Sequence, residues 1–273
     1  IIMGIPVYFK TIIENNKQCI NRPQIVDNLL FDLNCLIHPC CREETDELQM
    51  YKKIVDSIVN IVDIVNPQNI VYIAIDGPCP KQKMHQQRSR RFKSSKENKT
   101  WDTNAITPGT NFMENLEKYI NKHLQLNIKW ILDSSNNPGE GEHKLYNYIK
   151  NKQLNNNVIY GLDADLIMLG LLSPSKKTYL LRERTEYNIE CIDSEYVYLN
   201  IHKLQIQIIN LIKPKEYGYD NTQLIYDYIL LCFFLGNDFI QHTPSINIRY
   251  GGLDILLEVY NQLQLKYHGN FKL

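Results

Sequence analysis

The sequence predicts an α/β fold in which a mainly parallel sheet is flanked by helices. Two observations point to this class: short apolar segments recur along the chain, and segments with apolar residues at helical spacing separate them. Strands that alternate with helices form parallel sheets, because a parallel crossover needs a connection about as long as a helix. With 273 residues, of which 44% are hydrophobic, the chain can bury one large core, so we expect residues 1–273 to form a single domain.

The expected elements alternate along most of the chain. Strands are expected at residues 28–37, 69–75, 128–133, 158–162 and 178–181. Helices are expected at residues 46–65, from 83 onward, at 107–126, at 138–150 and over most of the chain after 193. The helix at 107 is expected to start with Thr107 as its cap and Pro108 in its first position.

Charge is concentrated in one segment of a neutral chain. Between Lys81 and Lys99 there are eight basic residues and one acid, Glu97, which gives a local charge of +7 in a chain of net charge zero. A neutral protein does not coat nucleic acid uniformly, but a local basic patch of this strength is compatible with binding it at one place.

The cysteine count and the lack of long apolar runs limit where the protein works. None of the seven cysteines forms a Cys-x-x-Cys pair, which predicts a reducing compartment; we expect the cytoplasm, and the nucleus also fits. The longest apolar run, residues 228–235, is far shorter than the roughly 18 residues that span a membrane, so we expect no membrane contact. No signal peptide is predicted, and Met3 is the expected native start.

Acidic residues recur where the expected strands end or the expected helices begin. The seven candidates are Asp32, Asp76, Glu140, Glu142, Asp163, Asp165 and Asp238. Ligands of such sheets bind beyond the carboxyl ends of the strands, and Asp163 and Asp165 would face one side on an extended backbone. Taken singly, each acid is more simply explained as a turn former or as a partner of a helix dipole.

Taken together, the acids point to metal binding. Two carboxylates about 4 Å apart repel by roughly 4 kcal/mol at an effective dielectric constant of 20, so a cluster of them needs protons or cations. Carboxylate oxygens select Mg²⁺ or Mn²⁺. Two such ions form the usual clamp for hydrolysis of a phosphodiester, so we expect two ions and a catalytic role for all seven acids.

The basic segment carries a second pattern. Lys83, Gln87, Arg90 and Arg91 are spaced to form one stripe of a helix. Two guanidinium groups, an ammonium group and an amide on one stripe suit a terminal phosphate. From spacing alone, a solvated basic face or a nuclear-import-like run is an equally good interpretation.

Eight segments together resemble the N-terminal catalytic region of the 5′→3′ exoribonuclease family of the Xrn/Rat type. The matching segments are Met3–Pro6 with Tyr8-Phe9, FDLNCLIH (31–38), AIDGPCPKQKMHQQRSRRF (74–92), ITPGTNFM (106–113), PGEGEHK (138–144), YGLDADLIMLGL (160–171), LLRE (180–183) and GNDFI (236–240). They occur in the order of the family over nearly the whole chain. The QQRSRRF and GLDADLIML blocks are the most specific.

The resemblance implies a fold and roles for the candidate residues. The fold would be PIN-like and related to flap endonucleases, with residues 1–273 as one nuclease domain. The seven acids match the metal ligands of the family, the stripe from Lys83 to Arg91 matches its 5′-monophosphate pocket, and His38 matches a histidine that stacks near the 5′-terminal nucleotide. The substrate would be single-stranded RNA with a 5′-monophosphate, degraded to mononucleotides with Mg²⁺. A second conserved region normally follows, so a later segment or a protein partner would complete the active site.

Other interpretations remain open. A flap-type endonuclease would use the same acids, and a non-catalytic RNA-binding subunit could retain the fold. A haloacid-type phosphatase is set aside, because Asn34 stands where that chemistry needs a second aspartate. Zinc at His38 is rejected, because the adjacent Cys40 and Cys41 cannot both bind one ion comfortably.

Overall fold

The computed structural model describes residues 8–96, 101–161, 163–175, 177–184, 194–213, 220–237, 240–241 and 243–273. The chain divides into two compact units. Residues 23–162 form one unit, called the sheet unit below. Residues 1–22 and 163–273 form the other, called the helical unit.

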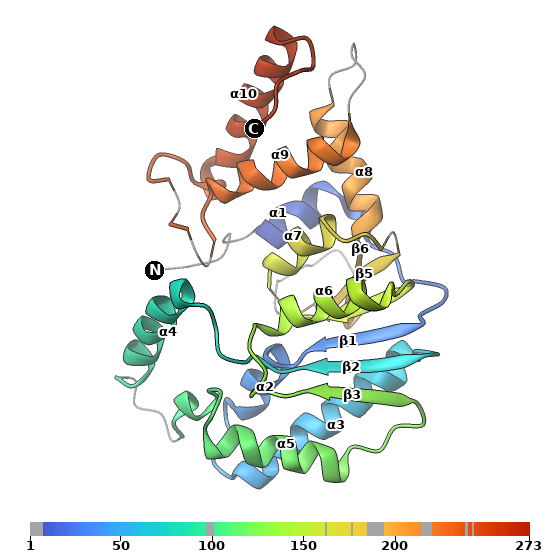
Figure 1. Cartoon of the computed structure of the whole chain (residues 1–273), viewed down its shortest axis with the longest axis vertical. Helices are drawn as coiled ribbons and strands as arrows, with labels where there is room; N and C mark the ends of the chain where they lie inside the picture. The colour runs from blue at the N-terminus through green and yellow to red at the C-terminus, as the bar shows by residue number, and fades with distance from the viewer. Residues whose placement is uncertain are drawn as a thin grey trace. The chain divides into compact units, whose positions relative to one another are not determined.

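The sheet unit is built on four parallel strands in the order β3-β2-β1-β4, of which β3, β2 and β1 are labelled in Figure 1. Their bounds are β1 Asn28–Asp32, β2 Ile70–Ala74, β3 Lys129–Asp133 and β4 Asn157–Tyr160. Every residue of β1, β2 and β4 is buried, as expected for strands covered on both faces, whereas β3 is partly exposed. The predicted class, a mainly parallel sheet flanked by helices, is therefore confirmed.

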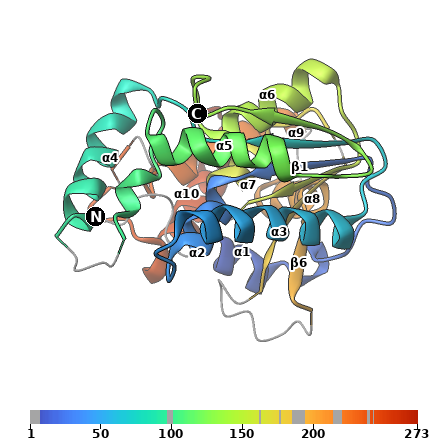
Figure 2. The ribbon, with the colours of Figure 1, turned by 90° about the horizontal axis from the view of Figure 1, so that it is seen from below.

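Helices connect these strands. Their bounds are α2 Asn34–Cys41, α3 Glu47–Val65, α4 Lys81–Ser94, α5 Asn111–His123 and α6 Gly141–Lys152, with a short 3₁₀ turn at Thr103–Ala105. Helix α6 packs against β1 and β2, and α3 packs against α2 and α5; α3 and α5 lie side by side in Figure 1 and Figure 2. In both views α4 lies to one side of the four strands.

Side-chain amides hold the amino ends of the strands together. Asn28 donates from Nδ2 to Asn157 Oδ1 at 2.8 Å, and Asn69 donates from Nδ2 to Asn28 Oδ1 at 2.9 Å. Asn28 and Asn157 are both buried, so these hydrogen bonds satisfy polar groups that would otherwise cost free energy in the core. Uncharged amides thus join the amino ends of these strands, whereas Asp32 ends β1 at the opposite, carboxyl edge.

The helical unit contains a two-stranded antiparallel ribbon and mostly helices. Its elements are α1 Tyr8–Asn15, a 3₁₀ turn at Lys17–Cys19, α7 Asp165–Leu171, β5 Thr178–Glu183, β6 Tyr196–Asn200, α8 Ile201–Ile212, α9 Asn221–Phe233, a 3₁₀ turn at Ile248–Tyr250 and α10 Gly252–Lys266. A buried hydroxyl pair, Tyr8 and Tyr228 at 2.8 Å, joins α1 to α9. Tyr260 donates to the buried Asp227 carboxylate at 2.7 Å and joins α10 to α9.

The first predicted strand is too long. Residues 28–37 were expected to be one strand, but β1 ends at Asp32 and α2 begins at Asn34. Leu33 donates its N–H to the carbonyl of Ala74, and Leu36 and Ile37 donate to the carbonyl of Leu33, so the chain turns directly into a helix. A continuous apolar run does not distinguish a buried strand from a buried helix.

Two helix starts also differ from the prediction. Helix α5 begins at Asn111 with Thr110 as its cap, not at Thr107, because Gly109 has a φ of +85° that no helix accommodates. Helix α6 begins at Gly141 rather than at Pro138 for the same reason, since Gly139 has a φ of +106°. Glycine adopts such angles without steric cost, and each of these two helices begins only after its glycine.

The end of the chain contains a strand that was not predicted. Residues after 193 were expected to be mostly helical, and α8, α9 and α10 agree with this, but β6 pairs with β5 in antiparallel register, with Leu181 opposite Tyr198. In β6, as in β5, most residues are buried, so alternation of polar and apolar residues was not visible. Among the residues that the structure describes, no helix is both long and apolar enough to cross a membrane.

The cap of α5 gives a test of the observed helix start. Thr110 Oγ1 accepts from the N–H of Met113 at 3.4 Å and donates to the carbonyl of Ala105 at 2.6 Å. Thr110→Ala should lower the free energy of unfolding by about 1 kcal/mol. Thr107→Ala, at the position that the sequence favoured, should stay within about 0.5 kcal/mol of the wild type. Urea titrations compare the two; equal losses would contradict the assignment.

Candidate functional site

Two strands of the sheet unit deliver carboxylates to the same edge. Asp32 is the last residue of β1, and its register partner on β2 is Ala74. Asp76 lies two residues beyond Ala74, so both acids sit at the carboxyl edge of neighbouring strands. Asp32 is buried and Asp76 is half-buried. Asn34 fixes the chain at Asp76, because its side-chain oxygen accepts the N–H of Asp76 at 3.0 Å.

The first residue of α6 meets both carboxylates. Gly141 donates its N–H to Asp76 Oδ1 at 2.6 Å. A Cβ atom at Gly141 would lie 2.7 Å from Asp32 Oδ1 and 3.3 Å from Asp76 Oδ1, so only glycine leaves both carboxylates undisturbed. The positive end of the α6 dipole therefore points toward two acids, which partly offsets their charge.

Helix α6 adds two more acids at its start. Glu140 precedes the helix and Glu142 lies in its first turn, and both are buried. Together with the exposed His143 they form a group whose ligand atoms all lie within 4.8 Å of one another. His143 Nε2 is 3.9 Å from Glu142 Oε1, which is beyond hydrogen-bond distance. Asp32, Asp76, Glu140 and Glu142 are called the acidic cluster below.

A lysine of the basic helix is paired with this cluster. Lys83 Nζ lies 2.6 Å from Glu140 Oε2, and both side chains are largely buried. The predicted 5′-phosphate stripe is thus in contact with the predicted metal ligands through this ion pair. A buried pair of this kind gains Coulomb energy but gives up the hydration of two charges, so its value here is to hold α4 against the start of α6.

The rest of the stripe is arranged around Gln87. Its Oε1 accepts from Arg91 at 3.3 Å and from the thiol of Cys79 at 3.3 Å. Burial and the nearby Glu140 raise the pKa of the Cys79 thiol, although Lys83 and Arg91 oppose this shift. Arg90 is exposed. Gln87 and Arg91 are therefore held in place by these contacts.

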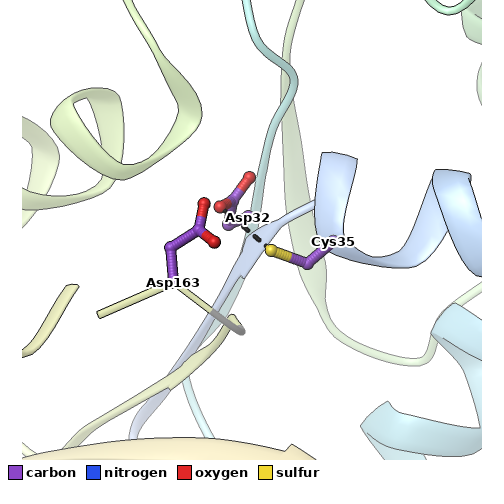
Figure 3. A group of neighbouring side chains, drawn as sticks. All are labelled: Asp32, Cys35 and Asp163. Carbon is purple, nitrogen blue, oxygen red and sulfur yellow. Dashed lines mark hydrogen bonds between the residues drawn. The ribbon is translucent and has the colours of Figure 1, made fainter. Parts of the chain in front are cut away.

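A thiol lies beside the acidic cluster. Cys35, in the first turn of α2, donates from Sγ to Asp32 Oδ2 at 3.2 Å, as the dashed line in Figure 3 shows. The spacing of three residues places the thiol one helical turn beyond the end of β1. Sequence reasoning did not select Cys35, and the only signal for it was its position three residues after a candidate ligand.

A buried lysine supports the frame behind α6. Lys144 Nζ donates to the carbonyl oxygens of Ile75 and Ser134, both at 2.8 Å, and lies 3.1 Å from Asp133 Oδ1. These contacts join the chain after β2, the chain after β3 and the first turn of α6. Burial raises the pKa of Asp133, but hydrogen bonds from Tyr72, Asn137 and Lys144 outweigh it and leave the pKa below its ordinary value.

Two backbone hydrogen bonds close the loops beside the cluster. Gly77 donates to the carbonyl of Gly139 at 2.8 Å, and Gly139 donates to the carbonyl of Pro78 at 3.1 Å. A Cβ atom at Gly77 would lie 1.7 Å from the carbonyl oxygen of Asn137, so any side chain at this position would clash with the backbone. The loop after β2 and the loop before α6 are therefore fastened to each other. We call this contact the glycine clasp.

Each of the remaining predicted residues that the structure describes is placed within its own unit. Asp163 and Asp165 belong to the helical unit; Asp163 is exposed, and Asp165 is the first residue of α7. The argument that an extended backbone places them on one face is wrong, because β4 ends at Tyr160 and Ala164 has helical dihedral angles. His38 is exposed in the last turn of α2. Asp238 lies outside the residues that the structure describes.

The acidic cluster fits a hard divalent cation. Its carboxylate oxygens are the donors that Mg²⁺ and Mn²⁺ prefer. One oxygen of Glu140 is available to bind an ion: Oε1 is buried and has no hydrogen-bond partner among the described residues. An orphaned buried carboxylate oxygen is costly unless a ligand completes it. A soft ligand is also within reach, since the Cys35 thiol contacts Asp32.

Comparison with known proteins gives matches over most of the chain. The family model described as the N-terminus of the XRN 5′-3′ exonuclease matches residues 3–100 and 94–184, and the model described as the Xrn1 helical domain matches residues 218–272. The chain is 32% identical to 5′-3′ exoribonuclease 1 and also 32% identical to 5′-3′ exoribonuclease 2, both of Schizosaccharomyces pombe. The alignments cover 96% and 86% of this chain, but only 24% and 31% of those relatives.

Solved structures share the fold. The catalytic core of Rad2 in complex with DNA substrate matches with a TM-score of 0.58 at 13% identity, over 98% of this chain and 74% of that one. The T5 5′-exonuclease with bound divalent metal ions matches with a TM-score of 0.50 at 14% identity, over 87% of this chain and 78% of that one. The flap-nuclease-like fold inferred from the sequence is therefore confirmed.

Gly141→Ala tests whether Asp32 and Asp76 both meet the start of α6. The added methyl group should displace Asp32 and Asp76 and weaken Mn²⁺ binding about tenfold or more. Helix propensity should leave stability unchanged or raise it by up to about 1 kcal/mol, so metal binding and folding are separable. Calorimetric titration measures the affinity, and Asn147→Ala, an exposed change on α6, is the control. Wild-type affinity in Gly141→Ala would disprove the proposed contact.

Asp133 gives a pH-dependent test of the contacts that Lys144 makes behind α6. Because its folded-state pKa is lowered, its contribution to stability is present above the ordinary pKa of about 3.9 and is lost as the pH falls through the folded value. Asp133→Asn should therefore destabilise the protein at about pH 6, and its difference from wild type should shrink below about pH 4. Urea titrations across this range measure it. Asp63→Asn, an exposed change on α3, should show no such trend.

Proposed function

Because the chain belongs to the XRN 5′-3′ exonuclease family, we propose that it is a metal-dependent 5′→3′ exoribonuclease that removes mononucleotides from RNA with a 5′-monophosphate. The chain spans about a quarter to a third of the length of the curated relatives it matches. The observation that carries the proposal is the Lys83–Glu140 ion pair at 2.6 Å, which joins a cationic helix to a cluster of metal-binding acids. Recognition of a strand end and hydrolysis of its first linkage require these two features side by side.

The proposed cofactor is a pair of Mg²⁺ or Mn²⁺ ions. Asp32, Asp76, Glu140 and Glu142 would hold them, and the buried, unpartnered Oε1 of Glu140 supports this assignment. When bound, such ions activate water and stabilise the charge that develops on the scissile phosphate. Asp163, Asp165 and Asp238 match metal ligands of the resembled family in the sequence, so we propose that they take part in binding these ions as well.

The protein's own residues would bind and orient the strand. Gln87, Arg90 and Arg91 would hold the 5′-monophosphate, since guanidinium and amide groups match phosphate oxygens in geometry and charge. Lys83 would hold Glu140 in place and stand at the border between the phosphate pocket and the acids. His38, exposed at the end of α2, would stack on the first base.

The relatives and the fold suggest what else the activity needs, where it takes place and which other function is the second candidate. The curated relatives are named 5′-3′ exoribonucleases and extend well beyond the matched part, so further segments or a protein partner would complete the active site. The free thiols of the described cysteines support work in a reducing compartment, which we propose to be the cytoplasm. The likeness to the Rad2 core bound to DNA favours a flap-type endonuclease as the second candidate.

Matched RNAs with a 5′-phosphate, a 5′-hydroxyl or a 5′-triphosphate test the proposal. In Mg²⁺, the wild type should degrade the 5′-monophosphorylated RNA at least about tenfold faster, because a charge-assisted contact to the end is worth about 1.5–3 kcal/mol. On RNA with a labelled 5′-phosphate, release of a labelled mononucleotide indicates the exonuclease, whereas longer labelled fragments indicate the flap-type enzyme. Binding without turnover, unchanged by chelator, would point to a non-catalytic subunit.

Two variants assign the residues in the same assay. Arg90→Ala should remove the preference for the 5′-monophosphate while activity on the 5′-hydroxyl RNA persists. Lys122→Ala, which removes an exposed cation of α5, should leave the preference intact. Undiminished preference in Arg90→Ala would contradict the assigned pocket.

A further inference from the structure

Helix α4 has a second face that the proposed phosphate pocket does not use. Lys81, His85, Arg88 and Phe92 follow one another at intervals of four, three and four residues, and all four side chains are exposed. At 100° per residue they lie within about 60° of one another, and about 150° from the centre of the stripe that begins at Lys83. This row is called the outer face of α4 below.

The outer face is cationic. The segment from Lys81 to Lys96 contains seven lysine and arginine residues and no acid. Among the residues that the structure describes, no ion pair involves Lys81, Arg88 or Lys96. Such uncompensated charge repels itself within one helix, and an anionic ligand would relieve that repulsion.

An aromatic ring lies in the middle of this charge. Phe92 is 64% exposed, although burial of its ring would be favourable. Lys96 Nζ lies 4.3 Å from the centre of the ring, a cation–π distance. Met84, 47% exposed, adds apolar surface one helical turn after Lys81. A flat apolar ring among exposed cations has the composition of a surface that binds single-stranded nucleic acid, where bases stack and phosphates pair with charge.

We propose that the outer face of α4 is a second binding site for single-stranded RNA, in which a base stacks on Phe92 while Arg88 and Lys96 contact the neighbouring phosphates. The row from Lys81 to Phe92 is about 16 Å long, enough to accompany several nucleotides of an extended strand. This site would hold the body of the strand, whereas the stripe on the opposite side of the same helix would hold its 5′ end. The choice of RNA as the ligand rests on the proposed function; the stacking geometry does not.

A binding assay without catalysis tests this site. In EDTA, fluorescence polarisation would measure the affinity for a 5′-hydroxyl oligouridylate of about 20 nucleotides and, as the shorter strand, for a 5′-phosphorylated dinucleotide, which the phosphate pocket would hold without reaching the outer face. Phe92→Ala should weaken binding of the longer strand at least about fivefold, the lower limit for loss of one stacked base, and leave binding of the shorter strand nearly unchanged. Arg88→Gln and Lys96→Gln should each reduce the slope of log affinity against log salt by about 0.7.

Three further variants make the result specific. Phe92→Leu keeps apolar bulk without the ring and should behave like Phe92→Ala. Phe92→Trp should bind like the wild type, and its added indole fluorescence should be quenched by the longer strand. Tyr250→Ala removes another highly exposed aromatic ring, 84% exposed in the helical unit, and should change nothing.

Each outcome decides the question. Unchanged affinity of Phe92→Ala for the longer strand, or an equal loss for both strands, would overturn the stacking site; an equal loss would mean that Phe92 supports the fold of α4. A loss that Phe92→Leu restores would overturn it as well. The measurement on the longer strand needs neither hydrolysis nor a 5′-phosphate, so failure of the stacking site is distinguishable from failure of the proposed exonuclease, which the end-preference assay reads.

Discussion

The accumulation of negative charge at the carboxyl edge of one sheet is the constraint on which the sheet unit depends. Asp32 and Asp76 come from neighbouring parallel strands, and the start of α6 brings Glu140 and Glu142 to the same region. Carboxylates this close destabilise the fold unless positive charge compensates them. The backbone N–H of Gly141 and the ammonium group of Lys83 supply part of it. The orphaned oxygen of Glu140 indicates that a cation would supply more.

The same requirement explains how the helices are placed. Helix α6 begins with glycine, and a Cβ atom there would displace the carboxylate of Asp32. Helix α4 must reach the cluster with a long, flexible cation, and Lys83 does so. Lys144 holds the opposite side of α6 by bonding to backbone carbonyl groups rather than to the acidic cluster. One lysine therefore balances charge, and the other fixes geometry.

The sequence predicted the parallel sheet and the acids that end its strands, because buried strands leave a strong apolar signal and the acids interrupt it. It did not predict where β1 turns into α2, since apolar residues continue across that boundary. The starts of α5 and α6 depend on the positive φ angles of Gly109 and Gly139, which no spacing rule reveals. The pairing of Lys83 with Glu140 joins residues 57 positions apart, so it became visible only in three dimensions.

The glycine clasp has a consequence for how this protein tolerates change. Gly77 and Gly139 join their loops by backbone atoms alone, and the space at Gly77 excludes even a methyl group. Neither loop can lengthen or acquire a side chain there without shifting an acid at its end. A substitution at this junction therefore acts on the acidic cluster from outside it, whereas a substitution on the exposed surfaces of α3 and α5 does not touch the clasp.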